Sequence, residues 1–388
     1  MGKWHRVLLG IVSILALVGG WWANVPAAEV EAQGTIARFA TLPDRSPGHP
    51  EGLTADGDGN IYAASFELNP STGCQPQPTL NWFPPARSGL ITGDLTCPFQ
   101  QNYIYVYSQS GQLKTSLPMP AGVVPLGMVT TATDLYVNDV FNGDLLRYTL
   151  PVTSTSTPVR TYNICGGFVV AFGAPGDFCG LNANDVGPDG RIYMSDNGAG
   201  PSVVGPPGFL RGRIFVVDPE TGASSVFFAN RELNVAGFPE FGVNGVAFAP
   251  DGSALFMANM STSKIFRLTL SSCASSCIPG TFALFIQGNG IHGPDNIDFD
   301  DQGNLWIASG QNDQVVAVNP AGQVIRRIGA IQGFTNEGAP RGLFQPSGIK
   351  FSKGIIYVGN ESNVTLRPPS DAGLFGGLRA FTLSRITP

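Results

Sequence analysis

The sequence contains few charged side chains and no long run of basic ones. Lysine, arginine, aspartate and glutamate make up 13% of the 388 residues, and the formal net charge is −6. Nucleic-acid binding relies on clustered lysine and arginine that neutralise phosphates. The composition therefore argues against a nucleic-acid partner.

The chain is also poor in histidine and lacks the cysteine spacing of zinc sites. It has three histidines, and its six cysteines form no Cys-x-x-Cys motif. The cysteines fall into three local pairs that each bracket one loop: Cys74 with Cys97, Cys165 with Cys179, and Cys273 with Cys277. We expect three disulfides in this arrangement, which implies an oxidising compartment.

The only long apolar run lies at the N-terminus. Lys3 and Arg6 precede the apolar residues 7–22, and small residues follow at 23–28. This order is typical of a secretory signal peptide over residues 1–28. The alternative is an uncleaved membrane anchor, although the run is shorter than the ~20 residues that a spanning helix needs. Cleavage would change the formal charge from −6 to −8 and leave a secreted or periplasmic, monomeric domain.

Glycine and proline are plentiful, at 50 and 31 residues, and they punctuate a repeated phrase. Residues 292–309 show it best: Ile297 and Phe299 alternate with acids, a Gly turn follows at 301–304, and Leu305 begins a second apolar strand. Six copies are recognised, at starts separated by roughly 50 to 75 residues. A second hairpin follows most copies, for example over residues 213–228. Residues 35–388 are therefore predicted to form one all-β domain, a six-bladed β-propeller with four antiparallel strands per blade.

The two ends of this domain are expected to complete the same blade. Residues 35–42 resemble the fourth strand of a blade, such as residues 111–118, whereas residues 377–383 resemble a third strand after which the chain stops. Pairing the N-terminal strand with the last blade would hide two exposed sheet edges.

Long and short connections are expected on opposite faces of the propeller. The turns between the first and second strands are short, as at residues 188–190 and 250–252. The long connections are expected on the other face, called the top: residues 67–101, 161–181, 198–210, 329–345 and 362–376. Long ordered loops gathered on one face often cover a binding site, although they could be decoration without function.

The first residue of each innermost strand is expected at the top mouth of the central channel. Around the propeller these residues read Glu51, Leu126, Asn184, Asn244, Asp295 and Ser347. Four of them carry carboxylate or amide oxygens, and Asn296 adds a fifth. Ca²⁺ prefers six to eight such oxygens, whereas zinc prefers cysteine and histidine. The pattern predicts a calcium site, or a site for another divalent cation; the alternative is that the asparagines only hydrogen-bond turns.

Other polar residues on the same face are candidates for catalysis and substrate binding. His49 and His292 lie close to Glu51 and Asp295 in sequence, and an unperturbed imidazole suits general base catalysis near neutral pH. They could equally be loop residues bonded to the backbone. Four residues at the ends of second strands are candidate substrate contacts: Asp139, Asp196, Asn259 and Glu361.

Three of the repeated stretches resemble the regucalcin/gluconolactonase family. They cover residues 184–191, 244–252 and 294–306, and the similarity extends over residues 35–385. The wider superfamily includes paraoxonases, diisopropylfluorophosphatases and strictosidine-synthase-like proteins. The resemblance implies a six-bladed propeller with one axial divalent metal, and enzymes that hydrolyse lactones, esters or phosphotriesters.

The resemblance also assigns individual residues. It implies that the metal is held by Glu51, Asn184, Asn244 and Asp295. Regucalcin-like members carry an arginine two positions before the third-blade asparagine, where this chain has Asn182. That departure argues against aldonolactone specificity.

Taken together, the sequence predicts an extracytoplasmic, Ca²⁺-dependent hydrolase of small lactones or esters. The cation would polarise the substrate oxygen, and Asp295 would serve as ligand and as base or nucleophile. Two alternatives stay open: a non-catalytic binding propeller with a structural metal, and a strictosidine-synthase-like enzyme without an obligatory metal.

Overall fold

The structure is a computed structural model, and it describes residues 35–43, 48–66, 101–140, 142–165, 179–197, 212–239, 241–362 and 378–388. The predicted signal peptide, residues 1–28, lies outside the described residues. No helix among the described residues is long and apolar enough to cross a membrane.

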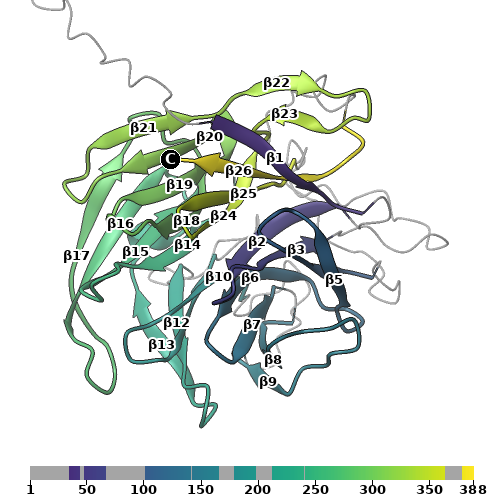
Figure 1. Cartoon of the computed structure of the whole chain (residues 1–388). Helices are drawn as coiled ribbons and strands as arrows, with labels where there is room; N and C mark the ends of the chain where they lie inside the picture. The colour runs from purple at the N-terminus through teal and green to yellow at the C-terminus, as the bar shows by residue number, and fades with distance from the viewer. Residues whose placement is uncertain are drawn as a thin grey trace, which may run out of the picture. The chain divides into compact units, whose positions relative to one another are not determined.

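Six four-stranded antiparallel sheets follow one another along the chain, and they form the predicted six-bladed propeller (Figure 1). The first three blades consist of β2 (His49–Ala55), β3 (Ile61–Phe66), β4 (Tyr103–Tyr107) and β5 (Leu113–Pro118); β6 (Pro125–Thr130), β7 (Asp134–Asp139), β8 (Asp144–Thr149) and β9 (Arg160–Asn163); and β10 (Leu181–Val186), β11 (Ile192–Asp196), β12 (Arg213–Val217) and β13 (Ser224–Ala229). The next two consist of β14 (Val243–Phe248), β15 (Ala254–Asn259), β16 (Lys264–Ser272) and β17 (Ile278–Gln287); and β18 (Pro294–Phe299), β19 (Leu305–Ser309), β20 (Gln314–Val318) and β21 (Val324–Ile328).

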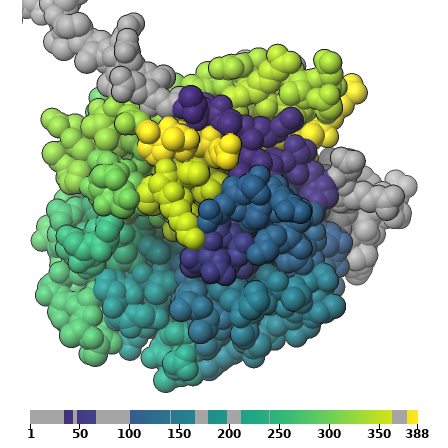
Figure 2. All heavy atoms as spheres, viewed as in Figure 1, coloured from purple at the N-terminus to yellow at the C-terminus, as the bar shows by residue number. Residues whose placement is uncertain are grey.

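The sixth blade is built from both ends of the domain. Its order is β24 (Pro346–Ser352), β25 (Ile355–Asn360), β26 (Thr382–Thr387) and then β1 (Thr35–Thr41). The two terminal strands, purple and yellow, lie side by side in Figures 1 and 2. Closure by the N-terminal strand is therefore confirmed.

The sequence predicts the third strand of that blade at residues 377–383, and the strand begins later in the chain. Residues 378–381 are not in a strand, and β26 begins at Thr382. The backbone N–H groups of Arg379 and Ala380 donate to the oxygen of Gly338, so this stretch belongs to the loop region. The strand proper begins where Thr382 and Ser384 can accept hydrogen bonds from the buried amide of Asn360.

The propeller is held together by apolar packing between neighbouring sheets. In the contact between blades 4 and 5, for example, Phe256 packs edge-on against Phe285 and Phe299, at centroid distances of 4.9 and 5.1 Å. Both faces of most inner strands are buried, so β3, β11, β14 and β15 read as near-continuous buried runs. This packing holds the blades together, so the starts of the innermost strands can carry polar side chains without loss of the apolar core.

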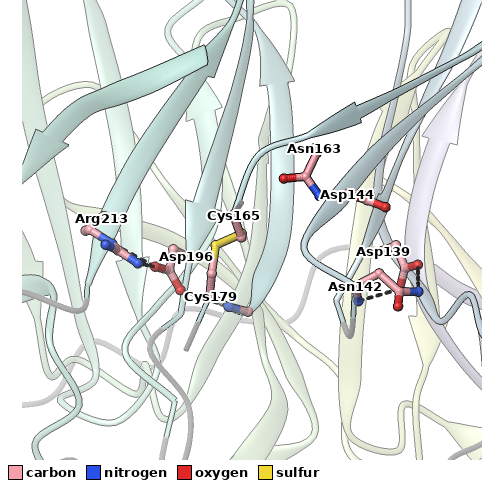
Figure 3. Close-up of a disulfide and its surroundings, with 9 residues drawn as sticks. Asp139, Asn142, Asp144, Asn163, Cys165, Cys179, Asp196 and Arg213 are labelled. Atoms are coloured by element: carbon pink, nitrogen blue, oxygen red, sulfur yellow. Dashed lines mark hydrogen bonds and ion pairs between the residues drawn. A yellow bond between two sulfur atoms is a disulfide. The ribbon is translucent and has the colours of Figure 1, made fainter. Parts of the chain in front are cut away.

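Two of the three predicted disulfides are present: Cys165–Cys179, which Figure 3 shows, and Cys273–Cys277. The first joins the end of blade 2 to the start of blade 3, and the second closes the β16–β17 hairpin. Cys74 and Cys97 lie outside the described residues.

Most of the long connections expected on the top face also lie outside the described residues. The stretch 329–345 is described, and it contains a short two-stranded sheet of β22 (Ile331–Phe334) and β23 (Pro340–Gly342). Two 3-10 turns, η1 (Arg231–Leu233) and η2 (Gly310–Asn312), complete the described elements.

Candidate metal centre at the propeller axis

Every innermost strand carries a β-bulge at the same point. The register shifts fall between Pro50 and Leu53, Pro125 and Met128, Leu181 and Asn184, Val243 and Val246, Pro294 and Ile297, and Pro346 and Ile349. A bulge places two residues opposite one and redirects a side chain. The first bulged residue of each blade is Glu51, Leu126, Asn182, Asn244, Asp295 and Ser347, and we call this set the axial ring.

In the third blade the strand pairing differs from the alignment of the repeats in the sequence. Leu181 pairs with Asp196, as Pro50 pairs with Ser65 and Val243 with Asn259. The residue equivalent to Glu51 is therefore Asn182, and Asn184 lies two residues further along the strand. The alignment took the third copy to begin at Asn184, inside the strand rather than at its bulge.

A signal in the sequence would have found Asn182. Turn glycines lie eight positions after four ring residues: Gly59 after Glu51, Gly190 after Asn182, Gly252 after Asn244, and Gly303 after Asp295. All four glycines have positive φ, between 69° and 84°, so the turn has one geometry in these blades. Counting back from the turn glycine gives the ring position without any structure.

Neighbouring inner strands meet at the ring through their backbones. A β-carbon at Gly245 would lie 2.4 Å from the backbone oxygen of Asp295, and one at Gly127 would lie 2.1 Å from that of Asn182. Only glycine permits this approach, so the spacing of the ring residues is set by backbone contact rather than by flexible side chains.

The ring side chains interact with one another across the channel. Burial raises the pKa of Glu51 well above its usual value; the charges of Glu361 and Asp295 raise it further, and a hydrogen bond from the Asn182 side chain partly opposes this. Burial also raises the pKa of Asp295 to about 7, opposed by a hydrogen bond from Asn244. The protein thus holds two carboxyl groups that ionise with difficulty unless a cation joins them.

Four buried side-chain oxygens at this place have no hydrogen-bond partner among the residues that the structure describes. They are the Oδ1 atoms of Asn182, Asn184, Asn244 and Asp295. A buried oxygen left unpaired costs about 1–3 kcal/mol, so four of them together require an explanation. Carboxylate and amide oxygens are the ligands that Ca²⁺ prefers, so the residues present fit a hard cation.

The orientation of Asn184 is fixed by its neighbour. Asn138 donates its Nδ2 to the backbone oxygens of Asn182 and Ala183, at 2.8 and 3.2 Å, so its own Oδ1 must act as an acceptor. The Nδ2 of Asn184 donates to that oxygen at 3.0 Å. The free oxygen of Asn184 is therefore presented to the channel, and Asn138 is a supporting residue that the sequence did not single out.

The donor set is not that of a zinc site. Among the residues that the structure describes, no group of three or more histidine, cysteine, aspartate or glutamate side chains could hold a metal. The ring mixes two carboxylates with amides, which fits Ca²⁺ better than zinc.

A small cavity of about 30 Å³ lies on the axis and is lined by inner-strand residues of all six blades, including Asn184 and Asn296. Lys350 also lines it and pairs with Asp298 at 3.1 Å. Burial raises the pKa of Asp185, a third lining residue, to about 6, although Lys350 partly opposes this. Asn296, which the sequence predicts as a ligand, thus lines the same cavity as the ion pair of Lys350 and Asp298. We call this cavity the lower cavity; the sequence pattern did not indicate the ion pair.

The predicted bases occupy different surroundings. The Nδ1 atom of His49 lies 2.7 Å from the backbone oxygen of Glu361, and its ring packs against Phe381 at 4.9 Å. The side chain of His292 is exposed, and its backbone N–H donates a hydrogen bond to Ser309 Oγ at 2.8 Å. His49 is therefore held in place by the fold more firmly than His292.

Two of the predicted substrate contacts are carboxylates that the fold already uses. Asp139 accepts a hydrogen bond from the backbone N–H of Val124 at 3.2 Å, and Asp196 accepts one from that of Gly180 at 3.0 Å. Asp196 also pairs with Arg213 at 2.6 Å (Figure 3). Each carboxylate ties the end of a second strand to the loop that leads into the innermost strand.

The other two candidates differ from each other. Asn259 donates from Nδ2 to the backbone oxygens of Glu232 and Asn234, both at 2.9 Å, and so also supports a loop. Glu361 is 3% exposed, and its charge raises the pKa of the ring residue Glu51. Their roles toward a substrate stay predictions.

The fold and this site define a class of protein, a six-bladed propeller of the lactonase type. The profile of the SMP-30/Gluconolactonase/LRE-like region matches residues 99–331, more than half of the chain. The chain belongs to that family. A search of curated protein sequences found no match.

Solved structures with the same fold cover nearly the whole chain. A luciferin-regenerating enzyme is similar over 92% of this chain and 95% of its own, with 12% identity and a TM-score of 0.59. The calcium-binding protein regucalcin from Agrobacterium tumefaciens covers 90% and 96%, with 14% identity and a TM-score of 0.56. A gluconolactonase from Xanthomonas campestris covers 91% and 89%, with 13% identity and a TM-score of 0.53. At these identities the likeness concerns the fold.

Proposed function

We propose that the protein is a Ca²⁺-dependent hydrolase of small lactones or esters that acts at the axial ring. The observation that carries the proposal is the group of four buried oxygens without a partner among the described residues, three from amides and one from the carboxyl group of Asp295. Burial raises the pKa values of Asp295 and of Glu51, the second ring carboxyl group. The family match supports the lactonase class, and the calcium-binding relative supports the choice of cation.

The residues that would hold the cation are Glu51, Asn184, Asn244 and Asp295. When bound, it would supply electrophilic stabilisation of the oxyanion that develops when an ester carbonyl is attacked. The protein contributes rigidity, because Glu51, Asn244 and Asp295 lie at bulges, and the backbones at Glu51 and Asp295 are in close contact with the neighbouring inner strands. Asn244 acts on Asp295 and lowers its pKa, and Asn138 accepts a hydrogen bond from Asn184. Asn296 would contribute from the side of the lower cavity.

His49 is the better placed of the two candidate bases. A backbone oxygen can only accept, so the bond to Glu361 puts the proton of the neutral ring on Nδ1. The lone pair is then on Nε2, the atom that would accept a proton from an attacking water. His292 and the carboxylate of Asp295 are the other candidates for this step, and Glu361 is the strongest candidate to contact the substrate.

The proposed location is outside the cytoplasm, either secreted or periplasmic. The two disulfides support this, because such bonds persist in oxidising compartments. The proposed partner is a small-molecule substrate bound by a monomer.

A panel of lactones, aryl esters and phosphotriesters tests the activity. The purified protein should hydrolyse at least one lactone or ester, and a chelator should abolish the activity. The Asp295→Ala variant should be inactive on the same compound. Hydrolysis that neither the chelator nor this substitution affects would contradict the proposal, and absence of hydrolysis across the panel would favour a binding propeller.

A further inference from the structure

Asn182 occupies a ring position, although neither its sequence alignment nor the proposed ligand set includes it. It is the first bulged residue of β10, equivalent to Glu51, Asn244 and Asp295 in their blades. Its backbone is held on both sides. Its carbonyl oxygen accepts a hydrogen bond from Asn138 at 2.8 Å, and it lies against Gly127 of the preceding blade.

The two polar atoms of its side chain have different surroundings. The amide acts on the Glu51 carboxylate as a hydrogen-bond donor and lowers the pKa of Glu51. Only Nδ2 can donate, so Oδ1 is the other end of the amide. That oxygen is buried and has no partner among the residues that the structure describes, and Asn182 is 2% exposed.

Asn360, another buried asparagine, differs from Asn182 in this respect. Asn360 is fully buried, and its Oδ1 accepts a hydrogen bond from the backbone N–H of Phe344 at 3.0 Å. Its Nδ2 donates to the hydroxyls of Thr382 and Ser384, at 3.0 and 2.9 Å. Both ends of the Asn360 amide are thus satisfied, whereas the Oδ1 atom of Asn182 has no partner among the described residues.

We infer that Asn182 is a further ligand of the axial cation: its Oδ1 binds the ion while its Nδ2 holds the Glu51 carboxylate beside it. This inference rests on the proposed function. A single hydrogen-bond donor could satisfy one of the four unpartnered oxygens, whereas one divalent cation can bind several oxygen ligands at once.

With Asn182 included, the number of oxygen ligands approaches the coordination number that Ca²⁺ prefers. Glu51, Asn182, Asn184, Asn244 and Asp295 supply five oxygen-bearing side chains. Ca²⁺ takes six to eight oxygens, and a carboxylate can provide two. Positions therefore remain for water or a substrate oxygen, so the site is suited to binding a reactant as well as the ion.

Calorimetric titration of the chelator-treated, full-length protein with Ca²⁺ tests this inference. Asn182→Ala removes both polar atoms and should weaken Ca²⁺ binding by at least about tenfold. Asn182→Asp keeps an oxygen at the same place and adds a charge, but it loses the donor to Glu51. It should bind Ca²⁺ more tightly than Asn182→Ala.

A matched control separates loss of a ligand from loss of stability. Asn102 is also 2% exposed, and its Nδ2 donates to the backbone oxygen of Val123 at 2.9 Å. Asn102→Ala should lower the melting temperature and leave the Ca²⁺ dissociation constant unchanged. Far-UV circular dichroism confirms that each variant is folded before titration.

Two results would overturn the inference while leaving the proposed function intact. In the first, the wild type binds Ca²⁺ and Asn182→Ala binds it equally well. In the second, Asn182→Asp is weakened as much as Asn182→Ala, so that the amide acts only by holding Glu51. A wild-type protein that binds no Ca²⁺ would instead remove the proposed function itself.

Discussion

A β-carbon at Gly348 would lie 1.8 Å from the backbone oxygen of Glu51, so the backbones of blade 6 and blade 1 are in close contact at the axial ring. Glu51 is one of the two ring carboxylates, and its position depends on this contact. The same arrangement relates Gly245 to Asp295. The backbone of the propeller therefore places the ring, and the positions of the ring side chains depend on glycines that are not among the proposed ligands.

We predict that Gly348→Ala displaces Glu51 and weakens Ca²⁺ binding. The added methyl group meets backbone, which cannot rotate away, so we expect a stability loss of about 1–3 kcal/mol or more. Gly57 has open space around its missing β-carbon, and Gly57→Ala is the matched control, with an expected change within about 0.5 kcal/mol. Chemical denaturation and calcium titration measure both effects; equal behaviour of the two variants would contradict the account.

Asp295→Asn and Asp295→Ala should both abolish hydrolysis while the propeller stays folded. Asp295→Asn keeps an oxygen but loses a charge, and Asp295→Ala loses both. Ca²⁺ at a hundredfold excess over its dissociation constant stabilises the wild type by about 2.7 kcal/mol. Chelation should therefore lower the melting temperature of the wild type, Ca²⁺ should restore it, and Asp295→Ala should respond to neither. A variant that melts as the wild type does with and without Ca²⁺ would exclude Asp295 as a ligand.

The stabilising effect of Ca²⁺ should increase as the pH rises through about 7. In the metal-free protein burial raises the pKa of Asp295 from its ordinary value of 3.8 to about 7. The folded state then holds a proton that the unfolded state releases, so the metal-free protein loses stability as the pH rises between these values. A bound cation removes this loss because it replaces the proton.

Melting curves of chelated and Ca²⁺-loaded protein, recorded from about pH 5.5 to pH 8.5, measure this difference. The gap between the two melting temperatures should widen with pH in the wild type and widen less in Asp295→Asn, in which residue 295 cannot ionise and Glu51 is the ring carboxyl group that remains. A gap that narrows as the pH rises would contradict the assignment.

A protein that begins at Arg45 should be poorly soluble. It lacks β1, which pairs with β26 along its whole length, and it lacks the buried side chains of Phe39, Ala40 and Leu42. Its loss exposes a sheet edge that can pair with other chains. A control that begins at Ala32 keeps the strand and should remain soluble. Size-exclusion chromatography and thermal melting compare the two, and a monomeric truncated protein with an unchanged melting temperature would show that β1 is dispensable.

The architecture could be predicted from the sequence because its signals are local. Turn glycines and alternating apolar residues mark the hairpins, and the match of residues 35–42 to later fourth strands predicted the closure that β1 makes with β26. The start of β26 was misplaced because buried hydroxyl partners of Asn360, rather than apolar spacing, set where the strand begins.

The site could be predicted only in part, for a physical reason. Glu51, Asn244 and Asp295 stand out as polar residues at repeat starts, but a bulge changes which side chain faces the axis without changing the sequence pattern. The repeat pattern therefore indicates Asn184 as the start of the third copy, whereas the bulge begins at Asn182. The support that Asn138 gives from another blade, and the pairing of Lys350 with Asp298, depend on contacts between distant segments that no local pattern records.

The claim on which the rest depends is that the axial ring binds a divalent cation. Titrating chelator-treated wild-type protein and Asp295→Ala with Ca²⁺ in a calorimeter tests it most directly. The account predicts a single binding event in the wild type, with release of protons near neutral pH, and no binding in Asp295→Ala. Absence of binding in the wild type, or identical binding in both proteins, would contradict it.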